Sequence, residues 1–177
     1  FWSTAFLLFL TFLVSTSLLA GIFYLVLLFQ LPKIKTLKDY TPSLATRVLS
    51  ADGGVIGYLY KEKRVLVSLS ELPPHLIQAF IASEDARFFK HAGVDVLSIL
   101  RALWKNLWAG GIVQGGSTIT QQVTKSLLLT PEKSFSRKIK EAVLAYRLDR
   151  DLSKEEILYI YLNQIYLGHG AYGVEAA

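Results

Sequence analysis

The sequence predicts a mainly α-helical chain of the α+β type, with an apolar N-terminal segment followed by a charged module. Three observations support this class. All 19 Lys and Arg and all 14 Asp and Glu residues lie after position 32 of the 177-residue chain. A short region of β-type alternation comes next, and apolar residues then recur at helical spacing after Pro74. The absence of Cys excludes a disulfide-stapled scaffold and a Cys-ligated metal domain.

Residues 1–31 are predicted to form a transmembrane helix. The segment is dominated by Leu, Phe, Val and Ile and exceeds the roughly 20 apolar residues that span a bilayer core. Phe1, Trp2 and Tyr24 are candidate interface anchors. A signal peptide and a buried core helix are the alternatives, but a signal peptide has a shorter apolar region and a small-residue cleavage site. We therefore expect a retained membrane anchor.

Residues 32–45 are predicted to be a stalk between this anchor and a domain over residues 46–177. Lys33, Lys35 and Lys38 follow the apolar segment. The positive-inside rule compares both flanks of a span, so these lysines alone do not decide the orientation. The chain does not begin with Met and stops at Ala177 without a tail, and we expect it to be part of a longer protein.

The domain is predicted to start with a β-hairpin. Residues 46–50 and 55–60 are β-prone and flank Asp52-Gly53, a strong two-strand turn signal. A third strand is predicted at 64–69, before Pro73-Pro74. Helices are then predicted at 75–89, 95–108, 118–128, 131–148 and 154–166.

Two of these helices have capping-box signals at their start. Thr118 is followed three residues later by Gln121, and Ser153 by Glu156. Each pair predicts an N-cap whose side chains satisfy two of the backbone amides left open at the helix start.

Glu84 is the first candidate for chemistry. It lies within the apolar stripe formed by Ile77, Phe80, Ile81 and Phe88, so we expect its carboxylate on a buried face. A desolvated carboxylic acid has a raised pKa and can exchange protons near neutrality. The alternative is a structural ion pair with Arg87.

A glycine-rich loop leads into a cluster of hydroxyl and amide side chains at residues 110–122. A helix start after glycines is a natural anion site, and Lys125 lies one turn further on. The loop is no Walker motif, because no Gly-Lys-Ser/Thr follows. The alternative is a flexible loop with an ordinary cap.

Basic residues form a third candidate. Lys133, Arg137 and Glu141 are spaced by four and share one helix face, beside Lys138 and Lys140. Arg and Lys suit phosphate oxygens, although a solvated charged face is the commoner explanation of such a row.

The helix predicted at 95–108 combines apolar residues with two basic ones. Such a helix suits a membrane surface, although plain core packing is more common.

Four ordered segments resemble the signatures of peptidoglycan glycosyltransferases, which occur in bifunctional class A penicillin-binding proteins and in monofunctional relatives. These segments are residues 84–93, 116–125, 137–142 and 154–173. Ser126 stands where the family usually has Asn, and Tyr159 where it usually has an acidic residue. The resemblance implies a lysozyme-like helical glycosyltransferase domain that is incomplete at its C-terminus.

The resemblance also implies a reaction. Lipid II is the acceptor and the growing glycan the donor, undecaprenyl pyrophosphate is the leaving group, and the anomeric configuration inverts. Glu84 is the implied general base, and Glu141 a second catalytic carboxylate that positions the basic row or holds a divalent cation. The implied substrate-binding residues are Asp85, Arg87, Phe88, His91, Ser117, Thr118, Gln121, Gln122, Lys125, Lys133, Arg137 and Lys138.

No cofactor and no protein metal site are expected, apart from Mg²⁺ or Mn²⁺ bridging the pyrophosphate. The expected partners are lipid II, the growing glycan strand, the membrane and proteins of a cell-wall synthesis complex, with no nucleic acid. The expected location is the bacterial plasma membrane, spanned once, with the domain on the extracytoplasmic face. Trp104, Trp108, Ile112 and Val113 are candidates for a region that dips into the membrane.

Two other functions stay open from the sequence. A lysozyme-like hydrolase or lytic transglycosylase also uses a helix-borne Glu. A membrane-anchored module that binds the wall without turnover is the alternative from another class.

Overall fold

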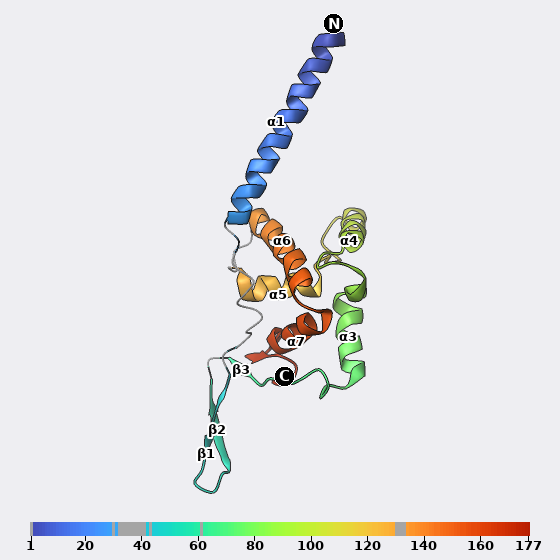
Figure 1. Cartoon of the computed structure of the whole chain (residues 1–177). Helices are drawn as coiled ribbons and strands as arrows, with labels where there is room; N and C mark the ends of the chain where they lie inside the picture. The colour runs from blue at the N-terminus through green and yellow to red at the C-terminus, as the bar shows by residue number, and fades with distance from the viewer. Residues whose placement is uncertain (1, 30, 32–41, 43, 61, 130–133) are drawn as a thin grey trace. The chain divides into compact units, whose positions relative to one another are not determined.

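The computed structural model of the chain describes residues 2–29, 31, 42, 44–60, 62–129 and 134–177 (Figure 1). It contains two compact units, residues 1–33 and 34–177. Most of the described elements are helices, which confirms the predicted mainly α class. The predicted stalk at 32–45 lies largely outside the described residues.

The first unit is a single helix, α1 (Trp2–Phe29). Its hydroxyl groups donate back to carbonyls of the same helix, as from Thr11 to Leu8 at 2.9 Å and from Ser15 to Phe12 at 3.0 Å. This bonding satisfies the polar atoms of an otherwise apolar sequence internally. Among the described residues there is no helix whose length and apolarity together suit a membrane span. The anchor expected at residues 1–31 stays a prediction.

The second unit begins with the predicted hairpin. Strands β1 (Thr46–Leu49) and β2 (Val55–Leu59) pair antiparallel, with an irregularity next to Val48. The turn between them is closed by a 2.8 Å bond from the Ser50 amide to the Gly54 carbonyl. The Asp-Gly signal is therefore confirmed.

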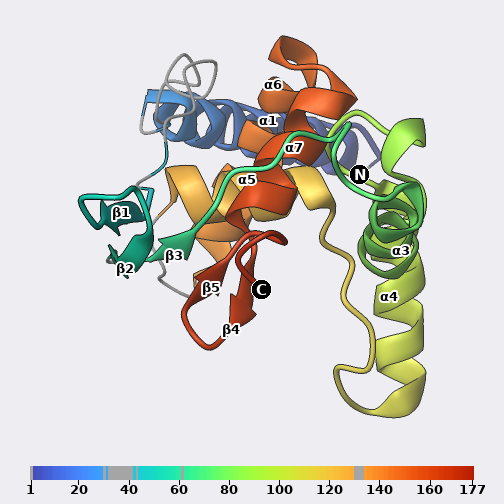
Figure 2. The same ribbon diagram turned by 90° about the horizontal axis from the view of Figure 1, so that it is seen from below.

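A second small sheet joins the beginning and the end of this unit. Strand β3 (Lys63–Arg64) pairs parallel with β5 (Ala171–Tyr172), which pairs antiparallel with β4 (Tyr166–Gly168), and Figure 2 shows the three strands side by side. The third strand predicted at 64–69 is therefore wrong in extent. The helix predicted to reach residue 166 ends at Gln164, because Tyr166 belongs to β4.

The helices are α3 (Pro74–Glu84), the short 3₁₀ turn η1 (Phe88–Lys90), α4 (Val96–Ala109), α5 (Ile119–Leu128), α6 (Phe135–Asp151) and α7 (Lys154–Gln164). The prediction of one helix over 75–89 is wrong at its C-terminal end. The chain leaves the helix at Asp85 (φ −156°), and the Phe88 amide then donates to the Asp85 carbonyl. This early end turns the residues after Glu84 away from the helix axis.

The core lies between α5, α6 and α7. It is built from fully buried aliphatic side chains, namely Ile119, Val123, Leu144, Leu148, Ile157 and Leu162. Both predicted capping boxes are present, with Thr118 and Gln121 at α5 and Ser153 and Glu156 at α7. The starts of these two helices are therefore fixed by the local sequence.

Candidate active site

Glu84 and Gln122 meet at a cavity of about 500 Å³ between the end of α3 and the start of α5. The Gln122 Nε2 donates to the Glu84 Oε2 at 2.8 Å, and this hydrogen bond joins positions 38 residues apart in the chain. Arg87, Arg101 and Ser117 line the same cavity. Residues of the first and second signature segments therefore line the same cavity.

The Glu84 side chain is exposed, so the expectation that it lies on a buried face is wrong. All side chains of α3 are at least partly exposed, because this helix is packed on one side only and Glu84 is its last residue. The alternative ion pair with Arg87 is also absent among the described residues, since the Arg87 Nε lies 3.3 Å from Asp95 Oδ2 instead. Glu84 is open to a ligand in the cavity.

Asp85, the next residue, is buried and anchors this corner of the site. Its carboxylate accepts from the His91 Nε2 at 3.0 Å and from the Ile119 amide at 3.1 Å. Ile119 is the first residue of α5, and its backbone amide has no hydrogen-bond partner within the helix. The Asp85 carboxylate supplies that partner. Asp85 therefore fixes Glu84 relative to Gln122, which lies one turn into α5.

Asp95 holds the start of α4 and the position of Arg87. Its carboxylate accepts from the Ser98 amide at 3.2 Å and from the Ser98 hydroxyl at 2.7 Å. Burial opposes the ionisation of Asp95, but the bonds from Ser98 and the charges of Arg87 and His91 outweigh it and lower the pKa of this carboxyl. Asp95 is thus held charged beside the cavity.

Phe88 and His91 pack inside the domain. Phe88 is fully buried, its ring lies edge-on to His91, and the Lys154 Nζ lies 4.7 Å from the ring centroid. Lys154 also donates to the His91 carbonyl at 2.7 Å and forms an ion pair with Asp149. These contacts tie the first signature to α7, so any contribution of Phe88 and His91 to substrate binding would be indirect.

The glycine-rich loop is held at both ends. At its start, the Asn106 Oδ1 accepts from the amides of Val113 and Gln114, both at 2.9 Å, and its Nδ2 donates to the Gln114 carbonyl. At its end, the Thr118 hydroxyl donates to the Gly93 carbonyl at 2.6 Å and accepts from the Gln121 amide. Asn106 was not predicted from the sequence, because its only signal is a polar residue within an amphipathic helix.

Thr118 and Gln121 were predicted to bind substrate, but their side chains are occupied by hydrogen bonds within the domain. Both side chains are buried and bonded within the capping box, with the Gln121 Oε1 accepting from the Thr118 amide at 3.0 Å. Ser117 and Gln122 are more exposed than Thr118 and Gln121, and both line the cavity.

The basic row meets the cavity through Lys138. Its Nζ donates to the Ser117 Oγ at 2.7 Å and pairs with Glu141, and the Arg137 Nη1 lies 3.0 Å from the other Glu141 oxygen. Glu141 is only 1 % exposed, so both of its oxygens are used to hold the two cations. Lys133 lies outside the described residues.

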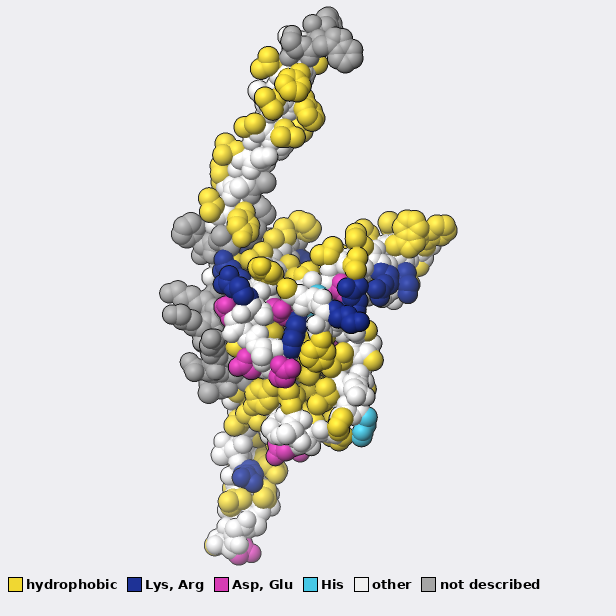
Figure 3. Space-filling model, turned by 45° about the vertical axis from the view of Figure 1, so that its right-hand side comes forward, with side chains coloured by type: hydrophobic (Ala, Val, Ile, Leu, Met, Phe, Trp, Pro, Cys, Tyr) yellow, Lys and Arg dark blue, Asp and Glu magenta, His cyan; other side chains and the backbone are white. Residues whose placement is uncertain are grey.

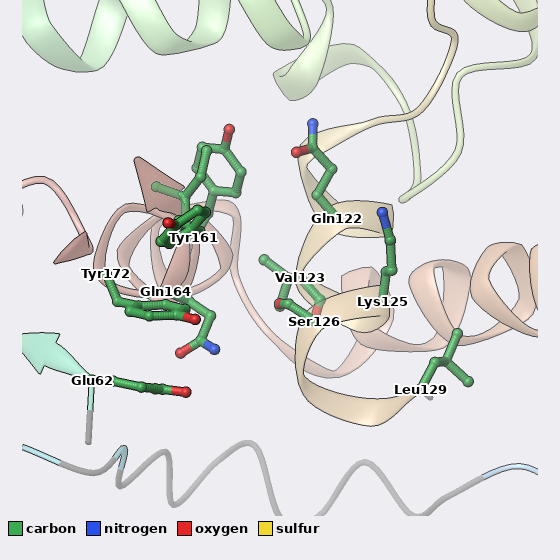
Figure 4. A pocket seen from close by; sticks show the side chains of 11 residues that line it. Glu62, Gln122, Val123, Lys125, Ser126, Leu129, Tyr161, Gln164 and Tyr172 are labelled. Atoms are coloured by element: carbon green, nitrogen blue, oxygen red, sulfur yellow. The ribbon is translucent and has the colours of Figure 1, made fainter. Parts of the chain in front are cut away.

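A second cavity of about 560 Å³ lies beside the first and also contains Gln122. Figure 4 shows Gln122, Lys125 and Ser126 projecting from α5 and Tyr161 facing them from α7. Lys125 therefore lines this neighbouring cavity. Tyr161 is a residue that the sequence analysis did not select for the site.

Helix α4 and the loop that follows it carry an exposed apolar surface. The side chains of Trp104, Trp108, Ile112 and Val113 are all exposed, with Ile112 at 93 %. In Figure 3 the projecting helix at the right carries hydrophobic side chains along one side and Lys and Arg side chains along another. The alternative of plain core packing for this helix is therefore wrong, because only Ala102 of α4 is buried.

The described residues contain no group of three or more His, Cys, Asp or Glu side chains that could hold a metal ion. A divalent cation at the site stays a prediction.

Comparison with known proteins identifies the class. Residues 52–177 match the family model described as Transglycosylase, and the chain belongs to this family. It is 51 % identical over 148 residues to penicillin-binding protein 1A of Aquifex aeolicus and 48 % identical over 148 residues to penicillin-binding protein 1A of Escherichia coli; each alignment covers 84 % of this chain. It is 44 % identical to penicillin-binding protein 1F of Bacillus subtilis over 93 % of its length. The alignments cover 20, 17 and 23 % of these relatives, so the chain spans about a fifth of their length.

Proposed function

We propose that the protein polymerises peptidoglycan glycan strands from lipid II by inverting glycosyl transfer. The observation that carries this proposal is the hydrogen bond between Glu84 and Gln122 at a cavity that is also lined by Ser117, to which Lys138 donates. It brings an open carboxylate, amide and hydroxyl groups and a cationic cluster to one place. These are the groups that a sugar transfer with a phosphate leaving group needs.

In this reaction Glu84 is the general base. Gln122 occupies the Oε2, so the Oε1 is the oxygen that takes the proton from the acceptor 4-hydroxyl. The acceptor oxygen then attacks the anomeric carbon of the donor, and the bond from that carbon to the pyrophosphate oxygen breaks. The undecaprenyl pyrophosphate leaves with the electron pair, and the configuration inverts.

Lys138 and Arg137 stabilise the charge that develops on the leaving pyrophosphate. Glu141 is a positioning residue in this scheme, because its buried carboxylate pairs with both cations. Lys125 and Lys133 are proposed to add to the clamp. A divalent cation would be held mainly by pyrophosphate oxygens, which is usual for Mg²⁺.

The lipid-linked substrate requires the site to work at a membrane. We propose that residues 1–31 anchor the protein once in the bacterial plasma membrane and that the domain lies on its extracytoplasmic face. The absence of Asp, Glu, Lys and Arg from residues 1–32 supports the anchor. The exposed apolar side of α4 supports a second, shallower contact with the bilayer, flanked by Arg101 and Lys105.

Polymerisation of fluorescent lipid II by the full-length protein tests the proposal. Glu84→Gln should abolish polymer formation while binding of lipid II persists, because the amide keeps the size of the side chain and loses the base. Lys90→Gln is the matched control, since its exposed side chain lies outside both cavities. Wild-type rates in Glu84→Gln would refute the base assignment.

The same preparation separates the remaining alternatives. Release of soluble fragments from preformed cell wall would instead indicate a lytic enzyme. Wall binding without polymer or fragments, unchanged in Glu84→Gln, would indicate a module without turnover.

A further inference from the structure

The hydroxyl of Tyr161 is a buried polar group to which the proposed reaction gives no role. Tyr161 is 2 % exposed, and its hydroxyl has no hydrogen-bond partner among the described residues. A buried hydroxyl without a partner costs free energy, so this hydroxyl is a candidate for a hydrogen bond that forms only when the site is occupied. The ring is fixed by an edge-on contact with Phe80 of α3, with 6.2 Å between centroids. Its ring is therefore packed against α3 one turn before Glu84.

Tyr161 lines the same cavity as Gln122, the residue that bonds Glu84. Figure 4 shows the Tyr161 hydroxyl and the Gln122 amide pointing to the same side of that cavity. Burial raises the pKa of Tyr161 above its ordinary value, and the negative charge of Glu84 adds to the rise. The hydroxyl thus stays protonated and is available as a donor, and Glu84 is the charged group that acts on it.

We propose that Tyr161 is a positioning residue that donates its hydroxyl hydrogen bond to the Glu84 carboxylate when substrate fills the site. This inference rests on the proposed function. With Gln122 on one side and Tyr161 on another, the carboxylate would be fixed by two donors from two helices. A lone pair of the Glu84 carboxylate would then stay directed at the hydroxyl of the acceptor sugar. A hydrogen bond from a neutral donor also favours the charged form, which is the form that accepts the proton.

Other charged and titratable groups face this pair. Lining the two cavities around it are Glu62, Asp85, Arg87, Arg101, Lys125, Tyr166 and Tyr172. Removal of one hydroxyl leaves all of them in place, so a change in the pH dependence can be assigned to Tyr161.

The test is Tyr161→Phe in the full-length protein, compared with wild type and with Tyr146→Phe. Tyr146 is exposed on α6 and lies outside both cavities, so it makes a matched control. Rates of lipid II polymerisation are measured from pH 5 to 9, together with the melting temperature of the ligand-free protein.

We expect Tyr161→Phe to melt at the same temperature as wild type or higher, because the ring contact is kept and an unpaired buried hydroxyl is removed. The acid limb of its pH–rate profile should move up by about one pH unit, because the carboxylate then takes a solvent proton more easily. Such a move lowers the rate about tenfold on that limb and much less at high pH. Tyr146→Phe should match wild type throughout.

A pH–rate profile of Tyr161→Phe with the same shape as that of wild type would overturn the proposed hydrogen bond to Glu84, whether the rate is unchanged or is reduced equally at every pH. A uniform loss would place the hydroxyl on substrate, and a loss of melting temperature without a change in the profile would make it structural. Absence of polymer from wild type itself would instead overturn the proposed function, and the role of Tyr161 with it.

Discussion

Gly93 allows a quantitative test of how the signature segments are held together. Its backbone is in the left-handed region (φ +78°), and a Cβ built on it would lie 2.3 Å from the carbonyl oxygen of Ala145 and 2.6 Å from the carbonyl carbon. Both are backbone atoms of the central helix α6, so neither can rotate away. Gly93→Ala must therefore displace the loop or the helix.

The expected destabilisation has two parts. An L-residue in the left-handed region costs about 1–2 kcal/mol, and overpacking a well-filled site costs about 1–3 kcal/mol more. We expect the free energy of unfolding to fall by about 2–5 kcal/mol, which lowers the melting temperature on the order of 10 °C in a domain of this size.

Gly110 provides the matched control. It has the same backbone handedness (φ +65°), and a Cβ there would meet no described atom within 4 Å. Gly110→Ala should therefore cost only the conformational part, about 1–2 kcal/mol. The difference between the two variants isolates the steric part.

Urea unfolding of both variants, followed by far-UV circular dichroism, measures these values. Gly93→Ala should also lose activity beyond its loss of stability, because the Gly93 carbonyl accepts the Thr118 hydroxyl at the start of α5. Equal destabilisation by the two substitutions would refute the close approach of Gly93 to α6.

Three further predictions follow from single contacts. Asp95→Ala should cost about 1–2 kcal/mol in thermal melts at pH 7, because the N-cap bonds from Ser98 are lost. Since the folded state lowers the pKa of Asp95, this contribution is complete above the ordinary pKa of about 4 and is lost as the pH falls through the lower pKa of the folded state, so the difference in melting temperature between variant and wild type should shrink progressively as the pH is lowered below about 4. Asn163→Ala should cost about 3 kcal/mol in urea unfolding, because the buried amide bonds both the N–H and the carbonyl of Val67. Arg137→Ala should reduce lipid II polymerisation far more than the melting temperature, and equal losses would indicate a structural role.

The sequence predicted those features that depend on neighbours in the chain. The two capping boxes and the Asp-Gly turn are set by residues three or four positions apart, so their signals can be read locally. The early end of α3 could not be read in this way. It depends on Asp85 bonding the Ile119 amide, 34 residues later, and a helical periodicity contains no information about such a partner.

The second sheet was missed for a similar reason. β3 has two residues and its partner β5 follows more than a hundred positions later, so neither segment shows a strand pattern of its own. Short strands of this kind are defined by pairing, and pairing between distant segments is a property of the folded chain.

Residues from the first two segments that carry the resemblance line one cavity, but the resemblance did not indicate which side chains would face it. Ser117 and Gln122 reach the cavity, whereas Thr118 and Gln121, in the same segment, are bonded within the cap. This division follows from helix geometry, because the residues that close a capping box point back along the backbone and their neighbours point away. Glu141 likewise lies one turn beyond the cations that it holds.

The exposure of Glu84 changes how its strength as a base must be explained in the proposed reaction. In the ligand-free site, water can reach the carboxylate, so the protein does not supply a dry pocket in advance. A bound sugar would displace that water and leave Glu84 facing the substrate, Gln122 and Tyr161. Loss of water favours the uptake of a proton by a carboxylate, whereas hydrogen bonds to its charged form oppose it. In the proposed reaction, the surroundings of the base are therefore completed only once the acceptor is in place.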